Sequence, residues 1–242
     1  MSGNIWYISD IHIGHKSIAG YRAAEQDMGP FWTITDHDQL LADNWDAVIR
    51  PDDIVNVLGD LSSGKDDAQF NALEWIKRRP GRKRLISGNH DGTHPMHRDA
   101  HKWLPIYLDG AFETVQSAGK QRFHPPQGID LPEGHKGYLT AFLSHFPYMA
   151  HPSTFVADHP GEHRIRYPEW RLPDCGHILI HGHVHSQNQY TIGGAQTFWT
   201  GVAAQGKKKV NQIHIGVDAW NLNPVPYEMV RELIWKAEMG WI

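Results

Sequence analysis

The segment that decides the fold is IWYISDIH at residues 5–12, an apolar run that ends in an Asp-x-His triplet. Its Ile and aromatic residues predict a short buried strand over residues 5–9. Asp10 and His12 are two positions apart, so if the chain stays extended both side chains point the same way. The segment therefore predicts a carboxylate and an imidazole side by side at a strand end.

Four further clusters place His, Asp or Asn directly after an apolar run. They are Gly59-Asp60, Gly88-Asn89-His90-Asp91, Ser144-His145-Phe146-Pro147 and His181-Gly182-His183-Val184-His185. Glycine precedes several of these residues, as expected where the backbone turns sharply or approaches a neighbour closely. Because ligands gather at strand ends in open α/β sheets, we expect the clusters to converge on one cleft.

Short apolar runs predict strands throughout the chain, at 5–9, 54–58, 84–87, 112–116, 138–144, 177–180, 196–200 and 212–217. Helical spacing predicts three helices. One is capped by Thr35 or Asp36, presents residues including Trp45 and Val48 on one face, and ends at Pro51. The second spans 66–79 with Phe70 inward, and the third spans 227–241. Strand and helix alternate early and strands dominate later, which predicts a layered α/β domain with mixed sheets.

Two stretches rich in Pro predict irregular inserts. Residues 94–109 are also rich in His, and residues 146–176 interleave five prolines with aromatic residues. Long irregular loops inside a compact domain are often functional. We therefore interpret the second stretch as a rim or lid over the site.

Length and composition narrow the functional classes. The 242 residues suit one domain over 1–242, and a lone Cys175 excludes an internal disulfide and favours a reducing compartment. The formal net charge of −4 argues against a nucleic-acid polymer as partner. Without a signal peptide or a membrane-length apolar run, we expect a cytoplasmic protein with no membrane partner. The oligomeric state is left open.

The residue types of the clusters explain the expected chemistry. Imidazole nitrogens and carboxylate oxygens together suit Mn, Fe, Zn, Co or Ni. Two such divalent ions beside Asp10 and Asp60 would leave an excess of positive charge. That excess favours a phosphate anion and a metal-activated hydroxide, and a neighbouring His90 could give a proton to the leaving alkoxide.

In this order, the clusters resemble the calcineurin-like metallophosphoesterase superfamily, whose pattern is D-x-H, GD, GNH(D/E), H and GHxH. The resemblance covers nearly the whole chain. Its details are most similar to small bacterial and phage phosphoesterases, in SDIHIGH at 9–15, NW at 44–45, PDDIV at 51–55 and GVDAWN at 216–221. The fold it implies is an α/β four-layer α-β-β-α sandwich with two mixed sheets.

The resemblance also implies residue roles. One metal ion would be held by Asp10, His12, Asp60 and His185, and the other by Asp60, Asn89, His145 and His183. His90 would be the catalytic proton donor. His181 has no ligand role in the family pattern, so it would support a ligand or simply belong to the strand.

This chain differs from the motif pattern of one branch of the family. In the protein Ser/Thr phosphatases the corresponding motifs are GDxVDRG and GNHE, whereas this chain has GDLSSG at 59–64 and GNHD at 88–91. The missing Asp-Arg argues against a phosphoprotein phosphatase and favours a phosphodiesterase, with cyclic nucleotides as one candidate substrate. The alternatives are a phosphomonoesterase, a nucleotide pyrophosphohydrolase, a nuclease, which needs a basic groove, and a binding scaffold, which the complete ligand set disfavours.

Other polar and aromatic residues have two readings each. His15, Arg164, Arg166 and Tyr148 are candidates for contact with a small phosphoester or nucleotide, since Arg grips phosphate well and aromatic rings stack on bases. The alternatives are structural support for His15 and salt bridges within a loop for Arg164 and Arg166. For Tyr148, as for Tyr167 and Trp170, the alternative to stacking on a base is packing within the loop. Asp91 would orient a neighbour or cap a helix, and Asp218 is interpreted as part of a structural turn.

Overall fold

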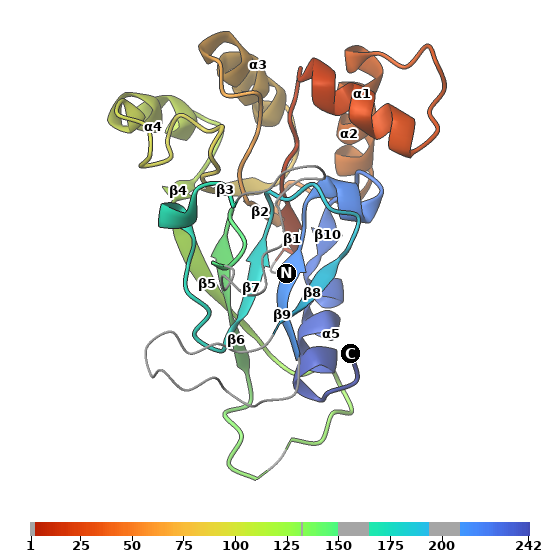
Figure 1. Ribbon diagram of the computed structural model, residues 1–242, viewed down its shortest axis with the longest axis vertical. Helices are drawn as coiled ribbons and strands as arrows, with labels where there is room; N and C mark the ends of the chain where they lie inside the picture. The colour runs from red at the N-terminus through yellow and green to blue at the C-terminus, as the bar shows by residue number, and fades with distance from the viewer. Residues whose placement is uncertain (1–2, 132, 150–164, 194–208) are drawn as a thin grey trace.

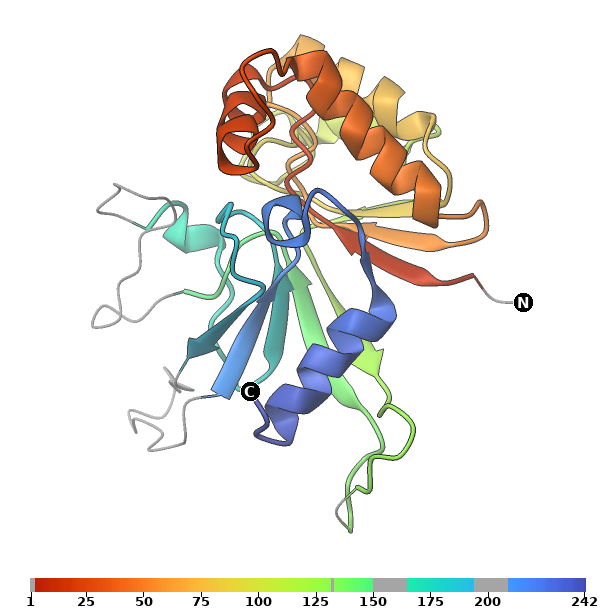
Figure 2. The same ribbon diagram turned by 90° about the vertical axis from the view of Figure 1, so that its right-hand side faces the viewer.

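Strand β1 (Ile5–Ile8) lies inside the first of two sheets that face each other (Figures 1 and 2). The computed structural model describes residues 3–131, 133–149, 165–193 and 209–242. Among these, the first sheet has the strand order β10-β1-β2-β3-β4. The other strands are β2 (Ile54–Val57), β3 (Arg82–Ile86), β4 (Thr114–Gln116) and β10 (Val225–Pro226). Strands β1 to β4 are parallel and β10 is antiparallel.

The second sheet of the described part has the order β5-β6-β7-β9-β8. Its strands are β5 (Ala118–Phe123), β6 (Leu139–Ser144), β7 (Ile178–His181), β8 (Tyr190–Gly193) and β9 (Lys209–His214). The central three are parallel and the two edge strands are antiparallel. A bridge between Ser9 and Gly216 joins the ends of the two sheets, so the carboxyl ends of both parallel sets lie together.

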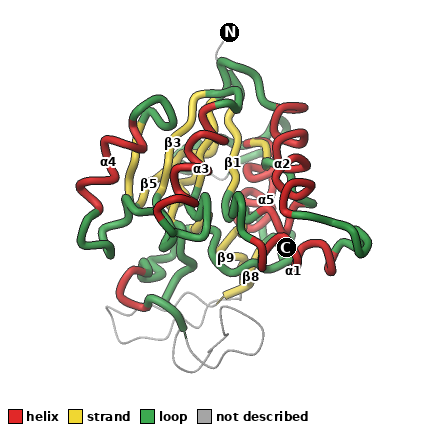
Figure 3. Tube along the Cα trace, turned by 90° about the horizontal axis from the view of Figure 1, so that it is seen from above, coloured by secondary structure: helices red, strands yellow, loops and turns green. Residues whose placement is uncertain are grey.

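Helices flank this pair of sheets. The outer face of the first sheet carries α1 (Lys16–Glu25), α2 (Ile34–Val48), α3 (Asp66–Lys77) and α4 (Ala100–Leu108) (Figures 2 and 3). Helix α5 (Tyr227–Glu238) packs against β9, β10 and β1. One core fills the space between helices and first sheet, and a second lies between the sheets and α5. The predicted α/β fold with two mixed sheets is confirmed.

The sequence placed most strands and missed those with polar patterns. Strands lie within 5–9, 54–58, 112–116 and 138–144, as predicted. The predictions at 84–87 and 177–180 are close, since β3 begins earlier, at Arg82, and β7 ends one residue later, at His181. The prediction at 212–217 is displaced, because β9 ends at His214 and a short helix, η3 (Val217–Trp220), follows. The prediction at 196–200 lies outside the described residues. Strands β5, β8 and β10 were not predicted, and β5 reads AGKQRF, with its polar residues on an exposed edge.

Helix predictions needed larger corrections. Helix α2 begins after Thr33, earlier than predicted, because Thr33 and Asp36 form a reciprocal capping box. Phe70 is 47 % exposed rather than inward, and Val48 is also exposed. Gln69 takes the inward position on α3, since its amide bonds Gly64, Gly92 and the Tyr107 hydroxyl.

Two helices, α1 and α4, lie where the sequence predicted none. Helix α4 occupies the stretch 94–109 that was predicted to be irregular, and it contains Pro105. Helix α1 follows the first polar cluster, with His15 as its N-cap. Across the described part of the chain, every helix is too short or too polar to cross a membrane.

Candidate metal centre

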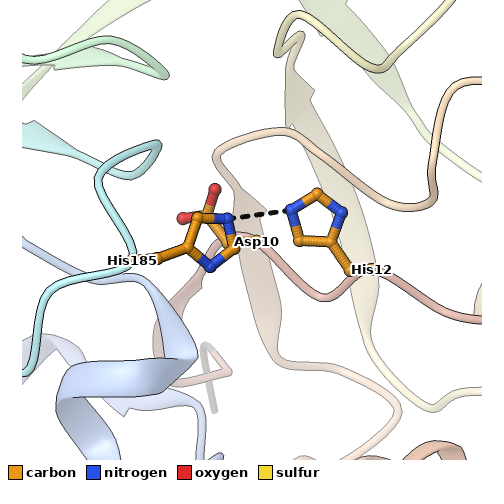
Figure 4. Close-up of side chains that lie close together, drawn as sticks. All are labelled: Asp10, His12 and His185. Carbon is orange, nitrogen blue, oxygen red and sulfur yellow. Dashed lines mark hydrogen bonds between the residues drawn. The ribbon is translucent and has the colours of Figure 1, made fainter. Parts of the chain in front are cut away.

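Loops at the carboxyl ends of β1, β2, β3, β6 and β7 bring the predicted ligands together. Asp10, His12 and His185 form one group, with one candidate ligand atom from each within 4.8 Å of the others (Figure 4). In that group Nε2 of His12 lies 3.1 Å from Nε2 of His185. Asp60, His145 and His183 form a second group on the same criterion. The structure thus places six of the predicted ligands in two groups.

Asp60 connects the two groups. Its Oδ2 lies 3.4 Å from His145 Nε2 and 3.8 Å from His12 Nε2. The seventh predicted ligand, Asn89, points its Oδ1 at His145 Nε2 across 3.1 Å. Asp60 is buried, with a side chain 3 % exposed. A single carboxylate is therefore within reach of imidazoles from both groups.

The backbone of the ligand loops is held in an unusual conformation. Asp10, His12, Asp60, His183 and His185 all have positive φ, between 46° and 76°. Residues other than glycine rarely adopt this left-handed backbone conformation, and those that do cluster at functional sites. The chain is therefore not extended at Asp10 and His12, and the expectation of a shared side of one strand is wrong. The loops bring the two side chains together instead.

Hydrogen bonds fix which nitrogen of three imidazoles faces the site. Nδ1 of His12 donates to the carbonyl of Ser62 at 3.0 Å, and Nδ1 of His145 donates to the carbonyl of Leu58 at 2.7 Å. Nδ1 of His185 donates to the Asp218 carboxylate at 3.0 Å. Carbonyl oxygens only accept hydrogen bonds, so each Nδ1 carries the proton. Nε2 is then the atom left to bind a proton or a metal ion.

These Nε2 atoms face other hydrogen-bond acceptors, so a cation between them, either a proton or a metal ion, would be stabilised. Burial opposes protonation of His145, but the adjacent Asp60 carboxylate raises the pKa of His145 to about 9. Burial opposes ionisation of Asp60 as well, yet His145 lowers the pKa of this carboxyl well below its ordinary value. Burial also lowers the pKa of His12 well below its ordinary value, which keeps that imidazole neutral.

The donor set fits divalent metal ions. Nitrogen and carboxylate oxygen donors on buried, pre-oriented side chains suit borderline-soft transition metals. Hydrogen-bond acceptors on the Nδ1 side, as seen for His12, His145 and His185, are the usual support of metal-binding histidines. The two His/Asp groups could hold two metal ions.

Comparisons with known proteins agree with this geometry. No protein-family model matches the chain. It is 42 % identical over 217 residues to the Gene 66 protein of Mycobacterium phage L5, covering 90 % of this chain and 87 % of that protein. The Gene 66 protein of Mycobacterium phage D29 is 39 % identical over 237 residues, covering 98 % of each chain. This chain belongs to the Gene 66 protein family.

A solved structure supports the fold of this Gene 66 family member. A protein of unknown function from Aquifex aeolicus, AQ665, superposes with a TM-score of 0.55, at 22 % identity, over 96 % of this chain and 100 % of that chain. This likeness concerns the fold alone. It agrees with the metallophosphatase-like α/β fold with two mixed sheets that the sequence predicts.

Two further residues of the GNHD segment support the site. Asp91 is buried and accepts the backbone N–H groups of Gly88, Asp60 and Leu61 at 2.7, 2.9 and 3.2 Å. It therefore orients its neighbours, one of the two roles expected for it. His90 donates its backbone N–H to Asp60 Oδ1, and its Nδ1 donates to the carbonyl of Ser63 at 3.1 Å.

The residues predicted to contact substrate lie in different surroundings. His15 is half-buried, caps α1 through its Nδ1, and has its ring 5.4 Å from that of His12. Arg166 is half-buried and its carbonyl accepts a bond from Arg171, while Arg164 lies outside the described residues. The expectation that the Tyr148 ring contacts substrate does not fit its surroundings. Tyr148 is 4 % exposed and its hydroxyl donates to the His177 carbonyl, so its ring packs inside the protein.

The sequence missed two buried charged residues beside the site. Arg22 on α1 is 1 % exposed. Asp218, interpreted as a turn residue, lies in η3 and contacts both Arg22 and His185. The GVDAWN segment was the one available signal, because it follows an apolar run as the ligand clusters do. Arg22 gave no signal, since a buried arginine contradicts the usual pattern of helix burial.

Proposed function

We propose that this protein is a metal-dependent phosphodiester hydrolase. The observation that carries the proposal is a set of three imidazoles whose Nδ1 atoms donate to other groups. The Nε2 atoms of His12 and His145 lie 3.8 and 3.4 Å from the Asp60 carboxylate, and Nε2 of His185 lies 3.1 Å from that of His12. One cation would be held by Asp10, His12, Asp60 and His185, and another by Asp60, Asn89, His145 and His183. Such cations act as Lewis acids toward phosphoryl oxygens and lower the pKa of water.

We propose His90 as the group that supplies the proton that the leaving alkoxide needs. The Ser63 carbonyl binds its Nδ1, so Nε2 is the atom that faces the site, 4.0 Å from Asp60 Oδ2. The His90 side chain is 37 % exposed, unlike the buried ligand candidates. It can therefore meet a substrate and exchange its proton with solvent.

Aromatic residues beside the site support a diester as the substrate. Tyr167 is half-buried, has φ of +52°, and its ring lies 5.9 Å from that of His183. The half-buried Trp170 follows, with its ring 5.0 Å from that of His94. A phosphodiester carries a second organic group that such rings can contact, as a nucleoside would. The absent Asp-Arg of the phosphoprotein phosphatases agrees with this preference, and cyclic nucleotides remain candidates.

A substrate panel tests the proposal. The protein is stripped with a chelator, reloaded with Mn²⁺ or Zn²⁺, and assayed on bis-p-nitrophenyl phosphate, p-nitrophenyl phosphate and cyclic nucleotides. We expect metal-dependent hydrolysis that is faster on the diester. Faster turnover of the monoester would make the protein a phosphomonoesterase, and two bound metal ions without any hydrolysis would favour a binding scaffold.

The His90→Gln variant tests the proton donor. We expect kcat to fall by about 10²-fold or more on a diester with an alkyl leaving group, within the usual range for a general acid. The fall should be much smaller with p-nitrophenolate, which leaves without a proton. His101→Gln is the control, because His101 is exposed on α4. An equal loss with both leaving groups would contradict the role.

A further inference from the structure

Arg22 makes an unusually complete set of contacts for a buried side chain. Its Nε donates to Asp218 Oδ1 at 2.7 Å, and its Nη2 donates to Asp218 Oδ2 at 3.0 Å and to the Asp10 carbonyl at 2.6 Å. Its Nη1 donates to the carbonyl of Ile11 at 3.2 Å and contacts His37 Nε2 at 3.0 Å. These contacts use every N–H of the guanidinium. Lysine, a single ammonium, could not replace them.

The network reaches the first group of ligands by two routes. Arg22 binds the main-chain carbonyl of Asp10, whose φ is +59°, and so supports the strained turn that presents this carboxylate. It also holds Asp218, whose Oδ2 accepts both Arg22 Nη2 and His185 Nδ1. Asp218 is thereby fixed where its oxygen binds the face of His185 that is turned away from the site.

We infer that Arg22 and Asp218 are positioning residues that set the orientation and the proton placement of His185 for metal binding. This inference rests on the proposed function for its biological purpose, but its test is metal binding itself. An imidazole that donates its Nδ1–H to a carboxylate presents Nε2 as the ligand atom. Without that carboxylate, the proton can move to Nε2 and block the ligand atom.

The remaining contacts of Arg22 extend the network from Asp218 to helix α2. Because Arg22 only donates, His37 Nε2 must accept, and His37 Nδ1 then donates to Asp38 at 2.8 Å. Asp38 in turn accepts the Gly14 N–H. The network therefore joins the loop after β1, α1 and α2, which follow one another in the sequence, to the distant η3.

Asp218→Asn tests the inference in the full chain. In the wild type, Zn²⁺ titrated alone by calorimetry should show two binding events. In the variant we expect one event to weaken by about 10–100-fold, the usual effect of losing a group that supports a ligand, and the other to be unchanged. At a Zn²⁺ concentration that saturates the wild type, nitrogen-15 spectra should show His185 bound through Nε2 and protonated at Nδ1, and the variant should lose that signal at the same concentration because its weakened site is largely empty.

The matched control is Asp53→Asn. Asp53 is also a buried carboxylate, and it accepts the backbone N–H groups of Arg50 and of Asn4, which directly precedes β1. This variant should lose stability while keeping both Zn²⁺ events. Arg22→Lys is a second test of the network. If the variant folds, we expect it to weaken the same single Zn²⁺-binding event.

Three results are decisive. Wild-type Zn²⁺ affinity at both events in Asp218→Asn would overturn the inference, as would an equal loss in Asp53→Asn, which would reduce the network to a structural role. A selective loss of one event supports the inference even if the substrate panel shows no hydrolysis. Failure of the inference and failure of the proposed function are therefore distinguishable.

Discussion

Asp60→Asn is expected to lower phosphodiester hydrolysis by at least about 10³-fold, roughly 4 kcal/mol of transition-state stabilisation. The amide keeps the shape of the carboxylate but removes the charge that lies 3.4 Å from His145 and 3.8 Å from His12. Because these imidazoles belong to different groups, both cation sites should weaken together. Measurements of kcat/KM at saturating Mn²⁺, with a parallel Mn²⁺ titration, check this result.

The joint loss separates Asp60 from every other ligand candidate. His185→Ala should weaken one metal-binding event, since His185 belongs to the first group alone, whereas Asp60→Asn should weaken two. Circular dichroism and thermal unfolding establish that each variant is folded. An Asp60→Asn protein that binds two Mn²⁺ ions and hydrolyses the diester within threefold of the wild type would disprove the bridging position.

The sequence predicted which polar residues lie together better than it predicted the elements around them. Each ligand cluster follows an apolar run, and parallel strands put their carboxyl ends at one edge of a sheet. The positions of Asp10, Asp60 and Asn89 could therefore be inferred without knowing the sheet order. The bridge between Ser9 and Gly216 brings the second sheet to the same edge, and no local pattern encodes that contact.

The parts that could not be predicted depend on contacts between distant segments. The side-chain directions of Asp10 and His12 follow from left-handed loops, which a rule for extended chains does not describe. The burial of Arg22 depends on Asp218, a partner 196 positions away. Tyr148 packs inward because its hydroxyl finds the His177 carbonyl, a contact visible only once β7 is in place. Burial of polar groups is decided by such partners rather than by local periodicity.

Gly59→Ala is expected to cause a large loss of stability. Gly59 has φ of +88°, and an added Cβ would lie 2.5 Å from the Gly88 nitrogen and 2.7 Å from His145 Nδ1. The left-handed conformation costs alanine about 1–2 kcal/mol, and forced contacts in a packed interior cost about 1–3 kcal/mol more. We expect the free energy of unfolding to fall by roughly 2–5 kcal/mol, measured by urea denaturation.

Gly14→Ala separates the two contributions. Gly14 has φ of +71°, but an added Cβ would have no atom within 4 Å among the described residues. It should therefore lose only the conformational part, about 1–2 kcal/mol, and keep its metal affinity. In Gly59→Ala the contact with His145 must be relieved by a shift of that imidazole or of the β3 loop, so metal binding should weaken as well. Equal losses in the two variants would mean that the close approach of the Gly59 and Gly88 loops does not hold the site together.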